Sequence, residues 1–194
     1  MYNKDLITAF KQGGQGNCVA ISAIKAGIEV FGINNIFQHK WDEKKEKCSV
    51  IMRDGYELGF TMDELKLAKE ASEFIPLKNS EVYEYAIICF TVMVKRAQEE
   101  ENDEWKDMSF ESAARTLNNG EDYLEGSHWI GLRQNVRSIG RRYIWQHKGV
   151  FGASKEHCFF ASQGYEDNYG VADQIDFDNR KYSKWFRFAS ESSH

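Results

Sequence analysis

The chain has 194 residues, 42% of them hydrophobic, which suits one domain with a substantial core. Its 25 Lys and Arg against 30 Asp and Glu give a formal net charge of −5, so no general attraction to nucleic acid or anionic membranes is expected. The apolar run at 86–94 is too short to span a bilayer, and no secretory signal opens the chain. We expect a soluble cytoplasmic protein, or one delivered by a route without a visible signal peptide.

The first predicted elements are a glycine-rich loop and a helix. Glycines lie at 13, 14 and 16, and apolar side chains then recur at helical spacing over about 17–30, ending at Phe31-Gly32. Further on, "SVIMRDGYELGF" has two apolar runs around Asp54-Gly55, a dipeptide favoured in tight turns. This segment predicts a β-hairpin.

Helices are predicted through the middle of the chain. Thr61 and Glu64 have capping-box spacing at a helix start, and that helix should end before Pro76. The segment 80–100 is apolar all round in its middle and so indicates a buried helix. A further helix is predicted at about 109–117, ended by Asn118, Asn119 and Gly120.

The C-terminal part has a different character. Residues 123–139 fit either a helix or an irregular stretch, whereas "RRYIWQ", "HCFFAS", "GVADQIDF" and "KWFRFAS" have the aromatic and β-branched content of short strands. The loop "KGVFGASKE" is expected to stay open to solvent. The fold class is therefore α+β, a single domain 1–194 with a mainly helical lobe at about 1–120 and a mainly β lobe at about 140–194.

Cys18 lies at the predicted start of the first long helix. Unpaired N–H groups and the positive end of the helix dipole favour a thiolate there, so we expect its pKa to be lowered. Cys48, Cys89 and Cys158 read as small hydrophobes, and with no paired Cys or His spacing the sequence implies no metal, no disulfide framework and no cofactor. Cys18 is the candidate nucleophile.

A nucleophilic cysteine needs a base, usually histidine. His157 opens a predicted strand that can hold an imidazole rigidly, and it is the first choice. His147, at the mouth of the preceding loop, and His128, after Gly126-Ser127, are the second and third choices. His39 and His194 are weaker candidates.

The segment "QGGQGNC" resembles the active-site signature of papain-like cysteine peptidases, including the calpain-type branch, in which a glutamine precedes the cysteine by six positions. The separation of 139 positions between Cys18 and His157 also lies within the roughly 130–150 expected in papain-type enzymes. The resemblance implies that Cys18 is the nucleophile and that Gln12 and the Cys18 N–H donate to the oxyanion. It also implies a helical lobe with the cysteine and a β lobe with the histidine.

The stretch "HCFFASQGYEDNYGVADQIDF" is similar to the histidine strand of that family. The family strand leads through a Gly-Tyr turn, here Gly164-Tyr165, to a second strand with an Asn or Asp that orients the base. Asp173 takes that role by this resemblance, and a carboxylate there would stabilise the imidazolium. If the register differs, the residues that could replace it are Asp176, Asn168 and Asp167.

The resemblance implies a thiol hydrolase, most naturally a peptidase that cleaves peptide or isopeptide bonds of a protein or peptide substrate through an acyl-enzyme. Two alternatives stay open. The same residue order serves transglutaminases and other acyl transferases, and a non-catalytic papain-fold binding module would keep the cleft without the chemistry. An amine-bearing probe would separate hydrolysis from transfer.

Overall fold

The computed structural model describes residues 3–120, 122–154, 157–175 and 184–191. Its helices are α1 (Asn3–Ile7), α2 (Cys18–Phe31), α3 (Met62–Ser72), α4 (Ser80–Glu99), α5 (Phe110–Thr116) and α6 (Glu125–Trp129), with 3-10 helices η1 (Asn102–Glu104), η2 (Arg133–Asn135) and η3 (Arg141–Gln146). Its strands are β1 (Phe10–Lys11), β2 (Gln38–Asp42), β3 (Lys47–Ile51), β4 (Glu57–Thr61), β5 (Ile75–Pro76), β6 (Val136–Ser138), β7 (Val150–Ala153), β8 (Cys158–Ser162), β9 (Tyr165–Asn168), β10 (Val171–Gln174) and β11 (Lys184–Phe188). Helices and antiparallel strands are combined, which confirms the predicted α+β class.

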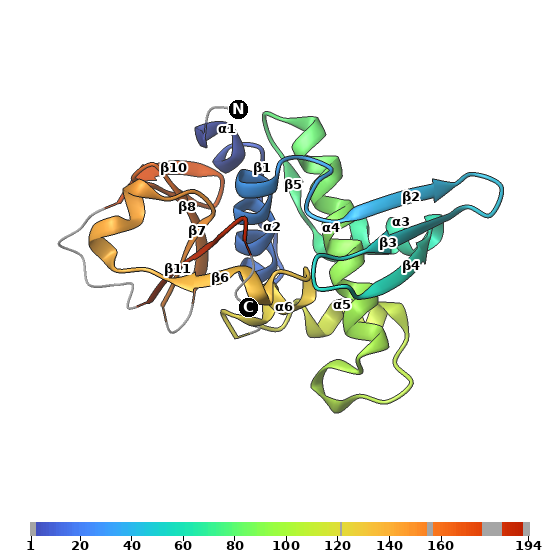
Figure 1. Ribbon diagram of the computed structural model, residues 1–194. Helices are drawn as coiled ribbons and strands as arrows, with labels where there is room; N and C mark the ends of the chain where they lie inside the picture. Colours follow the sequence, from blue (N-terminus) through green and yellow to red (C-terminus); the bar gives the residue numbers. More distant parts are fainter. Residues whose placement is uncertain (1–2, 121, 155–156, 176–183, 192–194) are drawn as a thin grey trace.

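Helix α2 lies at the centre of the molecule. Figure 1 shows it between a six-stranded sheet on one side and α4 on the other, and it packs on both β8 and α4. Its Ala- and Ile-rich sequence buries most of its surface, as expected for a helix that is apolar on nearly every face. One hydrophobic core therefore joins the helices to the inner face of the sheet.

The six-stranded sheet has the order β10-β9-β8-β7-β11-β6, and each neighbouring pair is antiparallel. Along β8, Cys158 and Phe160 belong to the core that includes α2, whereas Phe159 and Ala161 belong to a second core with Trp185. This alternation is the period of a strand that is buried on both faces. Strand β8 is thereby fixed against α2, and His157 directly precedes it.

Two tight turns connect β8, β9 and β10. Gln163 and Gly164 have φ of 48° and 83°, and Tyr169 and Gly170 have φ of 49° and 84°. Positive φ at both central residues is the requirement of a type I′ hairpin turn. The sequence placed this turn at Gly164-Tyr165; a turn is present, but its central residues are Gln163 and Gly164, one position earlier, and Tyr165 is the first residue of β9.

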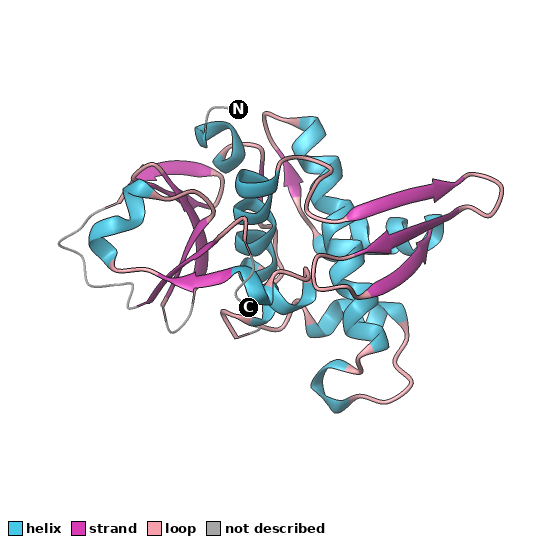
Figure 2. Ribbon diagram, in the orientation of Figure 1, coloured by secondary structure: helices cyan, strands magenta, loops and turns pink. Residues whose placement is uncertain are grey.

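Away from α2, a three-stranded antiparallel sheet, β2-β3-β4, extends past α4 (Figures 1 and 2). The predicted hairpin at Asp54-Gly55 is confirmed as the β3–β4 connection, with Gly55 at φ 84°. The Thr61–Glu64 capping box is present, and α3 ends at Ser72, before Pro76. Helices α4 and α5 also lie where the sequence predicted them, but strand β2 was missed.

Two predictions for the C-terminal part are wrong. Residues 141–146 form the 3-10 helix η3 and not a strand, and Trp145 from it packs on Gly164. The stretch "KGVFGASKE" is not a solvent-open loop, because it contains the wholly buried strand β7. Its Gly152 makes room for a neighbouring ring, since a Cβ there would lie 2.2 Å from Phe159 Cζ. The ambiguous region 123–139 contains α6, η2 and β6.

None of the helices in the described ranges is long and apolar enough to cross a membrane.

Candidate active site

The glycine-rich loop before Cys18 is docked on the C-terminal end of α3. The carboxylate of Glu73 accepts the Gly14 N–H at 3.1 Å and the Gln15 Nε2 amide at 2.6 Å. A Cβ on Gly13 would lie 2.2 Å from the Glu73 carbonyl oxygen, so glycine permits this close approach. The loop is therefore held in a defined position and delivers Cys18 to the first residue of α2.

Asn17 occupies the N-cap position of α2, but its side chain does not cap the helix. It is fully buried, and its Nδ2 donates to the Ser72 carbonyl oxygen at 2.8 Å and to Asn118 Oδ1 at 3.0 Å. Asn17 thus ties the loop to α3 and to the segment after α5. The N–H groups of the first helical turn therefore donate no hydrogen bond to this side chain.

A small cavity brings together three of the four residues expected from the sequence. Gln12, Cys18 and His157 all line a cavity of about 20 Å³, which is room for roughly one water molecule. The other lining residues are Ile21, Ser22, Cys158, Phe159, Phe160, Asp167 and Tyr169. The walls are therefore mainly the first turns of α2 and the start of β8.

His157 is fixed by its backbone and by aromatic neighbours. Its N–H donates to Ser154 Oγ at 3.0 Å, and its carbonyl oxygen accepts the Ser154 N–H at 2.9 Å. Its imidazole stacks on Tyr169 with ring centroids 5.5 Å apart and an interplanar angle of 15°, and on Phe159 at 6.3 Å. Stacking holds the plane of the ring and leaves its nitrogen-bearing edges for hydrogen bonds.

The other two candidate bases lie elsewhere. His128 is on α6, and its Nε2 lies 2.6 Å from Glu100 Oε2 at the end of α4. His147 follows η3, where burial and, secondarily, the charge of Arg187 lower its pKa. Neither residue lines the cavity with Cys18, whereas His157 does.

Gln12 lines the cavity, and its Nε2 donates to the carbonyl oxygen of Gln15 within the same loop. The amide group is thus close to Cys18 but is engaged by its own loop in this structure. The Nε2 group carries two N–H bonds, so an oxyanion can accept the second while the first still donates to the Gln15 carbonyl oxygen.

Asp173 lies on β10, opposite Glu166 of β9, and its Oδ2 accepts the Asn168 amide at 2.6 Å. It is three residues along the strand, roughly 10 Å, from the turn at Gly170, whose neighbour Tyr169 stacks on His157. The carboxylate in the cavity lining is Asp167, one of the substitutes considered from the sequence. Asp176, another substitute, lies outside the described residues.

Two residues near the site were not anticipated as part of it. Cys158 lines the cavity with its Sγ 3.0 Å from Ser22 Oγ, and burial raises the pKa of its thiol to about 12. Lys25 is fully buried on α2, and its Nζ lies 2.6 Å from Asp167 Oδ2. A lysine inside the apolar stretch "VAISAIKAGIEVF" was the available sign of such a buried pair.

Burial lowers the pKa of Lys25, and the charge and hydrogen bond of Asp167 act in the opposite direction. The Lys25 Nζ also donates to the carbonyl oxygens of Ile7 at 2.9 Å and Phe10 at 2.7 Å. All three ammonium protons therefore have acceptors, as a buried charge requires. In the part of the chain that the structure describes, no cluster of three or more His, Cys, Asp or Glu side chains is placed to hold a metal ion.

Comparison with known proteins adds no relationship: no family model matches the chain, and neither a curated protein nor a solved structure matches it. The function must therefore be argued from the cavity and its residues. The likeness of "QGGQGNC" to a papain-type signature supports a proposal about that cavity.

Proposed function

We propose that the protein is a cysteine hydrolase, most naturally a peptidase of papain-like arrangement acting on a protein or peptide. The observation that carries the proposal is that His157 lines a single cavity with Gln12 and Cys18, although it lies 139 positions after Cys18 in the sequence. Cys18 begins a buried helix, and His157 directly precedes a buried strand that packs on that helix. A nucleophile and a base on two fixed elements suit repeated proton transfer.

In the proposed reaction, the Cys18 thiolate attacks the carbonyl carbon of the substrate, and the imidazolium of His157 keeps the thiol proton. The negative oxygen of the tetrahedral intermediate accepts hydrogen bonds from the Cys18 N–H and from the second N–H of Gln12 Nε2. His157 then protonates the leaving amine, and the C–N bond breaks. A water molecule, activated by His157, hydrolyses the acyl-enzyme and releases the carboxylic acid and the free thiol.

The four cysteines provide an internal comparison for a direct test of this proposal. Burial raises the pKa of the thiols of Cys48, to about 11, and of Cys158, to about 12, and burial also raises the pKa of Cys89. At neutral pH all three should therefore remain protonated and react slowly with iodoacetamide. We expect Cys18 to be alkylated much faster than the other three in the folded protein, as measured by peptide mass spectrometry over time.

His157→Gln is the matched variant for this experiment, and His128→Gln is the control. We expect the first substitution to slow Cys18 alkylation at neutral pH and the second to leave it unchanged. Equal labelling of all four cysteines would refute the proposed chemistry. A Cys18 alkylation rate that is unchanged in His157→Gln would refute it as well. Either result would favour the interpretation that the protein is a non-catalytic binding module.

Hydrolysis and acyl transfer are separated by adding a labelled primary amine to casein and the protein. Hydrolysis predicts new amino termini in casein and no incorporated amine. Incorporation that depends on Cys18 would assign the same residues to a transferase.

A further inference from the structure

Tyr169 has three unusual properties at once. It stacks on the His157 imidazole and lines the cavity with Cys18, yet 54% of its surface is exposed. Its φ of 49° lies in the left-handed region, which is strained for an aromatic residue. The first central position of a type I′ turn favours Asn, Asp or Gly, so the turn itself gives no reason for tyrosine.

Asp167 and Lys25 hold the turn that contains Tyr169. The Gly170 N–H donates to Asp167 Oδ1 at 2.7 Å, and the other carboxylate oxygen of Asp167 pairs with buried Lys25. Gly170 also packs closely against Leu77, because a Cβ on Gly170 would lie 2.6 Å from a Leu77 methyl carbon. The buried Lys25–Asp167 pair thus connects α2, which begins at Cys18, to the turn whose Tyr169 stacks on His157.

We infer that Tyr169 is a positioning residue for His157, and that the Lys25–Asp167 pair holds its turn in place for that purpose. The inference rests on the proposed function. A tyrosine ring parallel to the imidazole restricts rotation of the base about its side-chain bonds. Strain concentrated beside a catalytic group fits this role, because the surrounding contacts impose a conformation that the turn alone would not adopt.

Tyr169→Asn is the decisive variant, because it creates the Asn-Gly pair that a type I′ turn prefers while it removes the ring. We expect its thermal unfolding midpoint to equal or exceed that of the unmodified protein. Cys18 alkylation by iodoacetamide at neutral pH should nevertheless fall, on the order of tenfold, because a base displaced by a fraction of an ångström loses its advantage. The His157 imidazole proton signals in NMR should move as the ring current of the tyrosine disappears.

Gln163→Asn is the matched control. Gln163 occupies the same position, with φ 48°, in the neighbouring β8–β9 turn and is likewise followed by glycine. It does not line the cavity. This variant should gain the same turn preference with no change in Cys18 alkylation and no change in the His157 signals.

The double variant Lys25→Met with Asp167→Leu tests the anchor, because replacing both charges avoids leaving one buried alone. We expect a folded protein, checked by circular dichroism, whose His157 signals and Cys18 rate shift in the same direction as in Tyr169→Asn. Unchanged His157 signals in both variants would overturn the inference even if Cys18 is reactive. Conversely, a Cys18 rate insensitive to His157→Gln would refute the proposed function, while the NMR signals would still report whether Tyr169 holds the ring.

Discussion

At the level of single residues, Gln12 has a proposed role that differs from the contact it makes. Its amide donates to the Gln15 carbonyl oxygen, whereas the oxyanion role requires donation to the substrate. Removing one oxyanion donor typically lowers kcat on the order of 10²–10³-fold. We expect Gln12→Ala to lower turnover of p-nitrophenyl acetate strongly without slowing Cys18 alkylation, which forms no oxyanion.

The control for that variant is Gln38→Ala on β2, which is exposed and outside the cavity. Its turnover and alkylation rates should both match those of the unmodified protein. Parallel losses of turnover and alkylation in Gln12→Ala would instead indicate that the loop has moved Cys18.

The proposed role of Asp173 leads to a second prediction for a single residue. If Asp173 orients His157, Asp173→Asn should slow Cys18 alkylation at neutral pH while stability stays within about 0.5 kcal/mol, as is usual for a partly exposed site. Site-resolved mass spectrometry and thermal unfolding measure the two effects. An unchanged alkylation rate would transfer the orienting role to Asp167, the carboxylate in the cavity lining.

At the level of elements, the glycine-rich loop is held by contact with α3. A Cβ on Gly13 would lie 2.2 Å from the backbone oxygen of Glu73. Because that oxygen belongs to the backbone, the clash can be relieved only if the loop moves away from α3. We expect Gly13→Ala to lower the free energy of unfolding by about 1–3 kcal/mol, the usual cost of overpacking. Because the same loop carries Gln12, turnover should fall as well.

Chemical unfolding and ester hydrolysis measure these two effects. Gly140→Ala is a suitable control, since its Cβ would meet only a tyrosine ring carbon at 3.3 Å, outside the loop. A Gly13→Ala protein as stable and active as this control would show that the loop is not held as described.

The sequence was a good guide to elements with a local signal and a poor guide to those set by distant partners. The helix at Cys18 followed from apolar spacing, the strand after His157 from aromatic and β-branched content, and the capping box fixed the start of α3. Strand β7 was missed because the stretch 148–156 was predicted to be an open loop, whereas Gly152 within it accommodates the Phe159 ring from the next strand. Such a contact leaves no trace in the local pattern.

The carboxylate that lines the cavity, Asp167, was the hardest residue to predict, for a physical reason. Successive strand residues point to opposite faces, so shifting the turn by one position exchanges the faces of Asp167 and its neighbours. The turn lies at Tyr169-Gly170, and tyrosine is not a residue that marks a type I′ turn. The sequence of this turn therefore did not reveal that the Asp167 side chain would pair with Lys25.

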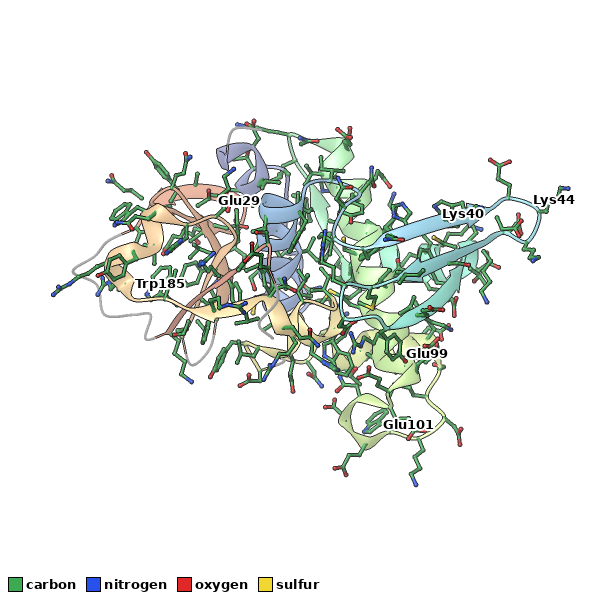
Figure 3. The ribbon with its side chains drawn as sticks, viewed as in Figure 1. Glu29, Lys40, Lys44, Glu99, Glu101 and Trp185 are labelled. Atoms are coloured by element: carbon green, nitrogen blue, oxygen red, sulfur yellow. The ribbon has the colours of Figure 1, made fainter. Side chains whose placement is uncertain are left out.

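At the level of the whole molecule, Glu29 joins α2 to the six-stranded sheet. Figure 3 shows it on α2 near the sheet, where it accepts hydrogen bonds from Ser162 Oγ and, at 2.6 Å, from the Gly149 N–H. Burial raises the pKa of Glu29 above its ordinary value of 4.5, although both bonds and the charge of Lys148 oppose this. The folded state therefore binds the proton more tightly than the unfolded chain does.

Stability should consequently fall as pH rises from about 4.5 through the higher pKa of the folded state, because the unfolded chain ionises first. We expect Glu29→Gln to flatten the dependence of unfolding free energy on pH in this window. Urea unfolding at a series of pH values measures it, with exposed Glu57→Gln as the control. If the unfolding free energy of Glu29→Gln depends on pH as steeply as that of the unmodified protein, Glu29 is not the cause of the dependence.

The central position of α2 also determines how the chain can be divided. Its apolar side chains belong to a core that includes α4 on one side and Phe151, Phe160 and Phe188 of the sheet on the other. A fragment ending near residue 120 would leave one side of α2 uncovered, and a fragment beginning there would lack the surface on which β8 folds. We therefore expect neither fragment to fold alone, and we expect Cys18 and His157 to come together only when both parts of the chain pack on the same helix.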